Sequence, residues 1–402
     1  MFLRVSLDDD PQGRQIADWL KSYPPKGIQE VEIEGLILKA RSIEDLRTQK
    51  AIFSGSILGR LSQLAQIEIL QRIRGLSQAI SKTAVLASED DGGADTILHG
   101  NAAESAVNDI KNNILNVSNS VESGILLDPN IDLDEAANDE VVEAVGAEDA
   151  IALRQYLLDT SHIPNSAEIP RSAVKFVPLL PAGIKPRFRY GQIAEKPVLV
   201  EICQYTAISV ESLEAPPATV FQLERMVQQL SHPKRTSFNI LPCVGYIQER
   251  SSRAFGVVFD MDGGCNMDEP PVILSKFYAL KRRVPLELRI QLAYTLAVAL
   301  SNFHQVGWVH KELKSENVLF FKRALDQGCS GPQSGSAEYT DIDLTQPRLF
   351  GFECSRPEDA ESLLNTDYTP KNNAYRHPQR WGKPMINFEK AHDVYALVRL
   401  SF

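Results

Sequence analysis

The stretch "WVHKELKSENVLFF", residues 308–321, determines how the C-terminal half of this 402-residue chain is interpreted. It places charged and polar side chains between apolar flanks. The preceding segment, residues 285–307, repeats apolar residues at helical spacing and predicts a long helix that leads into the motif. The candidate site residues of the motif are His310, Lys311, Glu312, Lys314 and Asn317. Two roles are open for this loop, a catalytic one and a structural one.

The composition is that of a folded protein with more than one domain. A length of 402 residues allows two or three domains, and a hydrophobic content of 43% is sufficient for their cores. No apolar segment reaches the length of about 18 residues that a membrane helix requires, and no signal peptide is recognisable, so a cytoplasmic location is expected. The five cysteines are odd in number and widely separated, which favours reduced core thiols over disulfides or a metal site.

Negative charge is concentrated in one segment of the chain. Residues 89–149 contain 16 acidic side chains and one lysine, whereas the net charge of the whole chain is −10. Such a segment does not attract nucleic acid, so nucleic acid is excluded as its partner. A solvated helical spacer is the favoured interpretation, and an acidic docking segment is the alternative.

The first 40 residues are predicted to form a small βαβ-like unit. Apolar residues recur at helical spacing after Asp10 and Pro11, which are suited to the first positions of a helix. The residues before this helix and the segment 31–40 after it are interpreted as strands. The first turn lacks the glycines of a nucleotide-binding loop, so a structural role is favoured for this unit.

Helical patterns continue from residue 52 to residue 158. Residues 52–86 form an amphipathic pattern with basic residues between the apolar positions, and two further helices are predicted at 102–121 and 135–158. A basic amphipathic helix can bind a membrane or a partner helix, but a place in a helix bundle is favoured. Residues 1–160 are therefore predicted to form a mainly helical region with a βαβ-like start.

A proline-rich segment follows this helical region. Residues 161–184 show no sustained period and are interpreted as a linker. From residue 185 the pattern changes to short strands and one long helix. Residues 185–402 are therefore predicted to form the second domain, and the chain as a whole is assigned to the α+β class.

The second domain resembles a protein kinase. Segments 196–205 and 219–232 resemble the third strand of the small lobe and the helix beside it, and "VHKELKSENVLFF" resembles the HRDLKxxN catalytic loop. The resemblance implies a small lobe at 185–262 and a partial large lobe at 263–402, because the chain ends before several expected helices. Further landmarks follow in the expected order: "RLFGFECSRP" at the DFG position, "YRHPQRWG" with Tyr375 and Pro378 at the APE position, and Asp393, which is expected to hold the loop through hydrogen bonds to its backbone.

The resemblance also identifies changes at the nucleotide-binding positions. Phosphoryl transfer by a kinase needs a glycine-rich cradle, a lysine on the third strand paired with a glutamate, a metal-binding aspartate and a catalytic base. Only Gly191 remains in the cradle. Glu201 stands at the position of the lysine and Glu224 at that of its partner, so these two glutamates are expected to repel each other.

The metal-binding motif is altered as well. Gly351, followed by Phe352 and Glu353, stands in place of DFG, so the aspartate ligand is missing. Glu312 keeps a carboxylate at the position of the base, but its extra methylene group misplaces the oxygen by about 1 Å. Lys314 and Asn317 are retained, and the favoured role for both is to stabilise the loop.

The favoured function is that of a catalytically inactive, kinase-like signalling or scaffold protein that acts through protein partners. Such a protein is expected to bind neither ATP nor magnesium nor another metal. The alternative is an atypical Ser/Thr kinase that uses Glu312 as base and Asn317 and Glu353 as metal ligands. A second alternative is a membrane-acting effector of cell death that works through the N-terminal helices. The motifs "GWVHKELKSENVLFF", "GFECSRP" and "YRHPQRWG" also resemble those of kinase-like domains in filamentous-fungal signalling and incompatibility proteins. This resemblance implies a role in self/non-self recognition.

Overall fold

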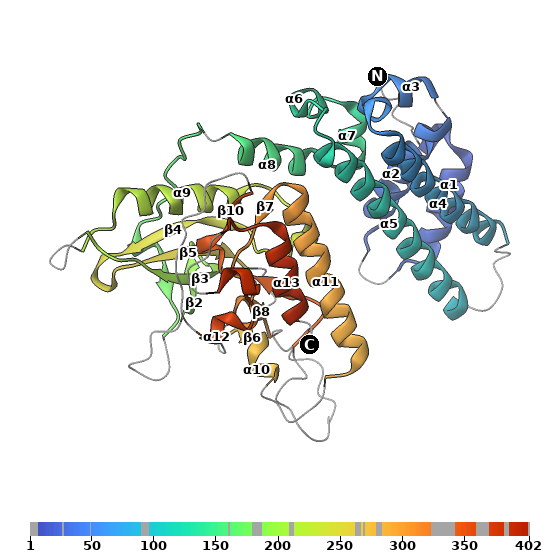
Figure 1. The fold of residues 1–402 in the computed structure, drawn as a ribbon. Helices are drawn as coiled ribbons and strands as arrows, with labels where there is room; N and C mark the ends of the chain where they lie inside the picture. Colours follow the sequence, from blue (N-terminus) through green and yellow to red (C-terminus); the bar gives the residue numbers. More distant parts are fainter. Residues whose placement is uncertain are drawn as a thin grey trace. The chain divides into compact units, whose positions relative to one another are not determined.

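The computed structural model combines α-helices with β-sheets, so the predicted α+β class is confirmed at this level. The chain divides into two compact units, Met1–Gln155 and Tyr156–Phe402, and each is described by itself (Figure 1). The residues that the structure describes are 7–25, 28–48, 50–89, 96–159, 161–178, 187–208, 213–261, 267, 270–278, 284–322, 342–358, 370–381 and 386–400.

The described secondary structure of the first unit is entirely helical. Helices α4 and α5 pack along each other, and α1 and α2 pack against α4 (Figure 1). The buried residues of α4 recur every three or four positions, as in Ile69, Ile73, Leu76 and Ile80. No helix in the described part of the chain is long and apolar enough to cross a membrane. The helices are α1 (Pro11–Ser22), α2 (Glu30–Thr48), α3 (Lys50–Gly55), α4 (Gln63–Ser88), α5 (Thr96–Leu127), α6 (Leu133–Ala136), α7 (Glu140–Val145) and α8 (Glu148–Leu158).

The predicted βαβ-like start is wrong, because its second strand is a helix. Residues 31–40 lie within α2, where Ile33, Ile37, Ala40 and Ile43 are buried at helical spacing. The apolar and polar alternation in "VEIE" covers only four residues, and the longer helical period that follows it determines the structure. The residues of the proposed first strand lie mostly outside the described ones.

The start of α1 is capped as the sequence predicts. Pro11 is the first residue of the helix, and the carboxylate of Asp10 accepts a hydrogen bond from the Gly13 N–H at 3.0 Å. The same carboxylate accepts a hydrogen bond from Nε of Arg41 on α2 at 2.6 Å. Asp10 therefore both caps α1 and ties it to α2.

The long helix predicted for residues 52–86 is interrupted. The chain forms α3, a 3₁₀ turn at Ile57–Arg60 and then α4, which Ser62 caps with its side chain. Two members of the predicted apolar stripe, Leu64 and Ile67, are exposed by 81% and 45% because the buried face of α4 lies elsewhere. A break of one turn between two helices changes which face of each helix packs against the core. A single continuous period of apolar residues in the sequence does not reveal such a break.

The other two predicted helices have different outcomes. Residues 102–121 lie within α5, as predicted, whereas residues 135–158 form α6, α7 and α8 instead of one helix. Asp139 caps α7 through the Val141 N–H, and Gly146 ends it in the left-handed conformation with a φ of 72°.

A five-stranded antiparallel sheet with the order β1–β2–β3–β5–β4 begins the second unit. Helix α9 (Pro217–Ser231) connects β3 to β4 and packs on β4. The strand predicted at 196–205 corresponds to β3 and the helix predicted at 219–232 to α9, so both are confirmed as elements. Val198, Val200, Ile247 and Val258 form the core on one face of the sheet. The strands are β1 (Lys175–Phe176), β2 (Phe188–Ile193), β3 (Lys196–Gln204), β4 (Cys243–Glu249) and β5 (Ala254–Asp260).

Part of the predicted linker 161–184 pairs with this sheet, so the interpretation of this part as a linker is corrected. The Ile169 N–H donates to the Tyr246 carbonyl at 2.7 Å, so the segment pairs with β4 at one edge, and it continues as β1 at the other edge. Between the two edges, Val174 enters the core of the sheet. Each contact involves only two or three residues, which is too short for a sequence period to reveal. We call residues 166–176 the strap.

The remainder of the second unit is built around the long helix α11 (Leu286–Gln305), which leads into the 310–317 loop as predicted. Helix α13 (Lys390–Leu400) lies beside α11 (Figure 1). The predicted lobe boundary at residue 262 lies outside the described residues. The shorter elements are β6 (Val272–Ile273), α10 (Leu274–Tyr278), β7 (Trp308–Val309), β8 (Val318–Phe320), β9 (Arg348–Leu349), β10 (Arg356–Pro357) and α12 (Pro370–Asn373), and their strands pair as β6–β8–β9 and β7–β10.

Candidate functional site

Asp393, on the first turn of α13, fixes the backbone of the 310–317 loop. Its carboxylate is fully buried and accepts hydrogen bonds from the N–H groups of His310 at 2.8 Å and Lys311 at 2.9 Å. These are the contacts that the sequence led us to expect. The two bonds hold Lys311 at a φ of 67°, which a residue with a side chain adopts only when its surroundings impose it.

His310 has the surroundings of a core residue. The ring is fully buried and lies 4.8 Å from the ring of Phe352 and 6.1 Å from that of Phe303. Its Nδ1 accepts a hydrogen bond from the Glu312 N–H at 3.3 Å. Burial lowers the pKa of His310, and the charge of Asp393 opposes this shift only in part. A neutral, enclosed imidazole supports the loop and is not placed to transfer protons to a substrate.

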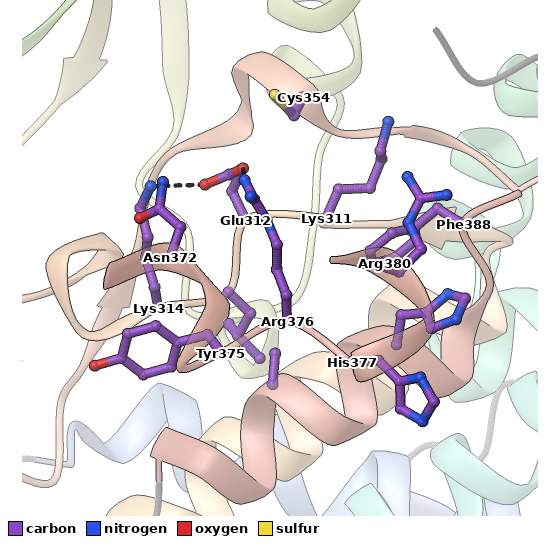
Figure 2. Close-up of a pocket in the computed structure, with 13 residues that line it drawn as sticks. Lys311, Glu312, Lys314, Cys354, Asn372, Tyr375, Arg376, His377, Arg380 and Phe388 are labelled. Atoms are coloured by element: carbon purple, nitrogen blue, oxygen red, sulfur yellow. Dashed lines mark hydrogen bonds and ion pairs between the residues drawn. The ribbon is translucent and has the colours of Figure 1, made fainter. Parts of the chain in front are cut away.

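Glu312 faces a pocket of about 240 Å³. Its carboxylate lies 2.6 Å from Nζ of Lys314 and 3.8 Å from Nη2 of Arg376, and Figure 2 shows both cations directed toward it. Both carboxylate oxygens are therefore engaged by cations, one closely and one loosely. A catalytic base would need one of these oxygens for the proton of a substrate hydroxyl.

Positive side chains and a thiol complete the lining of this pocket. Burial lowers the pKa of Lys311, and the charges of Arg356 and Arg380 act in the same direction. Burial also raises the pKa of Cys354 to about 11, so its sulfur is a thiol at neutral pH. The residues that line the pocket come from the 310–317 loop, the 352–354 turn, α12, residues 375–380, Phe388 and α13, so the pocket joins segments that are far apart in the sequence (Figure 2).

The two residues predicted at the closing motif have structural contacts. The Tyr375 hydroxyl lies 2.7 Å from Oγ of Ser315 in the 310–317 loop. Pro378 is the first residue of a 3₁₀ turn, Pro378–Arg380, which the ring of His377 caps through the Gln379 N–H. Tyr375 therefore contacts the loop directly, whereas Pro378 begins the turn that contains Arg380, which lines the pocket.

Asn317 connects the loop to the five-stranded sheet. Its Nδ2 donates to the Glu312 carbonyl at 2.5 Å, and its Oδ1 accepts a hydrogen bond from Nη1 of Arg187 at 2.6 Å. Arg187 immediately precedes β2. The same guanidinium donates from Nε and Nη2 to Oε1 of Glu201 on β3, at 3.0 and 2.5 Å. The amide oxygen of Asn317 is thus occupied by a cation of the chain itself.

Glu201 is a buried acid with one cationic partner. Its second oxygen, Oε2, accepts the Gly351 N–H at 3.4 Å. Burial raises the pKa of Glu201, although the charge and hydrogen bonds of Arg187 act in the opposite direction. Burial alone would lower the pKa of Arg187, but the charge of Glu201, its hydrogen bonds to Arg187 and the charge of Glu353 together raise that pKa. The two groups therefore depend on each other, because either one alone would be an uncompensated charge in a buried place.

Gly351 lies against this cluster in a left-handed conformation that favours glycine. Its φ is 81°, and a Cβ at this position would collide with the side-chain amide of Asn317. Phe352 is buried, whereas Glu353 is exposed on the following turn, and its negative charge acts on both Arg187 and Glu201. An aspartate cannot replace Gly351 while Asn317 keeps its present position.

The expected repulsion between Glu201 and Glu224 is not observed. Glu224 on α9 accepts a hydrogen bond from the Tyr246 hydroxyl at 2.9 Å, whereas Glu201 binds Arg187. Burial raises the pKa of Tyr246 to about 12, and the hydrogen bond to Glu224 contributes in the same direction. Each glutamate therefore has a partner that the sequence analysis did not assign to it.

Arg187 is one of two site residues that no sequence motif revealed. It follows a proline-rich segment without periodicity, so no motif marks it. A signal does exist, because a buried glutamate on β3 requires a cation nearby. In the β2–β3 hairpin, Phe188 is opposite Glu201, which places Arg187 one residue from that pair. Arg376 was missed for a similar reason, since its partner Glu312 lies 64 residues earlier in the chain.

The polar groups of the site do not form a metal centre. Among the described residues, no group of three or more His, Cys, Asp or Glu side chains is arranged to hold a metal ion. The amide oxygen of Asn317, which could serve as a ligand, is bound to Arg187. In comparisons with known proteins, no protein-family model matches this chain, and no curated protein matches it significantly.

Proposed function

We propose that this chain is a catalytically inactive, kinase-like signalling or scaffold protein that acts through contacts with other proteins. Three features of the second unit support the proposal: helix α9 between β3 and β4, helix α11 leading into the 310–317 loop, and the hydrogen bonds from that loop to Asp393. They occur in the order that the resemblance to protein kinases implies. The proposed arrangement is a small lobe at 185–262 and part of a large lobe at 263–402.

The observation that carries the proposal is the cluster of Arg187, Glu201 and Asn317. In a kinase, the corresponding positions on the third strand and the catalytic loop hold the phosphates and the metal. In this chain the same positions bind each other through three hydrogen bonds to one guanidinium. A nucleotide would have to separate Arg187 from the buried Glu201 before it could bind, which would leave the Glu201 carboxylate buried without its cation.

Charge acts against a nucleotide in the same way. The phosphates of ATP need a lysine and a metal ion to offset their negative charge. The charge of Arg187 is already balanced by Glu201, and Glu353 adds a further carboxylate nearby. Gly351 has no side chain that could bind magnesium.

Contacts with protein partners are assigned to the first unit. Its two longest helices expose large apolar side chains, including Leu64 on α4 and Leu98 and Leu127 on α5, by 81%, 66% and 61%. Apolar side chains on a helix surface are a common means of binding a partner helix.

Thermal unfolding of the full chain tests the absence of nucleotide binding. We expect the same Tm without ligand, with ATP and with ATP plus magnesium at millimolar concentrations, because a ligand that does not bind the folded state does not stabilise it. Asn317→Ala and the exposed Asn101→Ala serve as a matched pair. A magnesium-dependent rise in Tm that is lost in Asn317→Ala and kept in Asn101→Ala would instead support the atypical kinase with Glu312 as base.

A further inference from the structure

A single side chain, that of Arg187, links four segments of the second unit. It is attached to the start of β2, it binds Glu201 on β3, and it binds Asn317 in the 310–317 loop. Through the second oxygen of Glu201, the link extends to the backbone of Gly351 after β9. The sheet and the loop are therefore held together at this point by one guanidinium.

The acceptors around Arg187 fit a guanidinium better than a metal ion or an ammonium group. The Glu201 side chain is only 4% exposed, and its Oε1 accepts from two nitrogens of the planar fork at once. The orientation of Asn317 is also fixed, because its Nδ2 donates to the Glu312 carbonyl and leaves Oδ1 for Arg187. A lysine has one compact nitrogen and cannot span both acceptors in this way.

We propose that Glu201 and Asn317 form a guanidinium-binding site that the chain fills with its own Arg187, which acts as an internal latch between the sheet and the 310–317 loop. The latch rests on the proposed function in one respect, since both assign no nucleotide to this position. It goes further in stating what the site binds. The ligand class is a planar monovalent cation with several N–H donors.

Gly351 is part of the same device. A side chain at this position would collide with the amide of Asn317, so the latch closes only if residue 351 is glycine. The glycine that removes the metal ligand is therefore also the residue that allows Asn317 to meet Arg187. The glycine at position 351 and the hydrogen bond between Asn317 and Arg187 therefore depend on each other, because a Cβ at residue 351 would collide with the Asn317 side chain in its present position.

Chemical rescue of Arg187→Ala in the full chain tests the site directly. Removing the side chain leaves the buried carboxylate of Glu201 without its cation, so the Tm falls. We expect guanidinium or methylguanidinium chloride at millimolar concentrations to raise the Tm of this variant in a saturable manner. Tetramethylammonium chloride at the same concentrations has the charge but no N–H donors and produces no such rise.

Arg189→Ala is the matched control, because Arg189 lies two residues further along β2. Its Nη1 is 3.7 Å from Glu249, and its guanidinium stacks on Phe176 at 3.8 Å, so its loss removes an equal charge without opening the latch. Guanidinium should not raise the Tm of this variant or of the wild type, whose site is filled. An equal response of Arg187→Ala to guanidinium and tetramethylammonium would overturn the proposal.

If Arg187→Ala does not fold, Arg187→Lys provides a second test. It keeps the charge but cannot bind Glu201 and Asn317 together, so hydrogen exchange at the Gly351 amide should become faster than in the wild type. Arg189→Lys should leave this exchange unchanged. If hydrogen exchange at the Gly351 amide were the same in Arg187→Lys as in the wild type, the latch proposal would be contradicted.

The latch and the proposed function fail separately. Stabilisation of the wild type by ATP and magnesium, together with guanidinium rescue of Arg187→Ala, would retain the guanidinium-binding site and contradict the proposed absence of nucleotide binding. The absence of both effects would retain the inactive kinase and exclude the latch.

Discussion

At the scale of single residues, buried charges and a positive φ determine which groups meet in the site. Glu201 is buried where the resemblance to kinases requires a lysine, and such a carboxylate is tolerated only with a cationic partner. Arg187, the residue before the adjacent strand β2, supplies that partner. Gly351, with a φ of 81°, leaves the space that Asn317 uses to join them. The loop residues could be predicted from their motif, whereas Arg187 becomes visible only through the pairing of β2 with β3.

A pH-dependent prediction follows for Cys243, which is buried at the start of β4. Burial raises the pKa of this thiol from 9.0 to about 11. Between these values the folded state binds more protons than the unfolded state, so stability is fully present below pH 9 and decreases as the pH rises toward 11. Relative to Cys243→Ala, the wild type should lose about 2–3 kcal/mol of unfolding free energy across this window.

Urea unfolding of the wild type and of Cys243→Ala over the alkaline range measures this difference. Both proteins share all other titrating groups, so only the difference between their pH profiles reports on Cys243. Parallel profiles would show that the thiol is not buried in the folded protein.

At the scale of elements, long periodic segments could be predicted and short contacts could not. Helices α9 and α11 and strands β3 to β5 agree with their sequence patterns, because their apolar residues repeat over a sufficient length. The strand predicted at 31–40 is a helix, since the alternating pattern covers only four residues and the helical period of buried residues continues beyond them. The strap escaped prediction because its pairing with β4 and β2 uses only a few residues at each edge.

Gly245 on β4 provides a test of the strap. Its φ is 148°, and a Cβ there would lie 2.5 Å from the carbonyl oxygen of Ala167 in the strap. We expect Gly245→Ala to separate this part of the strap from the sheet and to lower the unfolding free energy by about 1–3 kcal/mol. Hydrogen exchange should increase at Ile169, whose N–H pairs with β4.

Gly35→Ala is the control for this substitution. Gly35 lies within α2, and no atom is within 4 Å of the position that its Cβ would take. The same change there should raise the unfolding free energy by about 0.5–1 kcal/mol, because alanine restricts the unfolded chain and favours the helix. A loss of stability in Gly245→Ala without faster exchange at Ile169 would contradict the proposed pairing.

At the scale of the whole molecule, the chain consists of two units that each bury their own apolar residues. The first unit has its core between helices, and the second has cores on the sheet and around α11. The acidic segment 89–149 belongs to the helical unit, where Asp132 and Asp139 cap helices and Glu148 lies in a first turn. Some of its acidic side chains therefore stabilise the first turns of short helices. The net charge of the segment alone did not predict this role.

Two matched core substitutions test whether the units unfold separately. Ile73 on α4 and Ile247 on β4 are both fully buried. Replacing either one by alanine should lower the unfolding free energy of its own unit by about 2–5 kcal/mol. Calorimetry of the full chain should show two transitions. Ile73→Ala should lower only the transition of the helical unit, and Ile247→Ala only that of the sheet-containing unit, since a cavity weakens the core in which it lies. If both transitions moved together in either variant, the two units would be one cooperative structure, and contacts made by the helical unit could not be treated as independent of the Arg187 site.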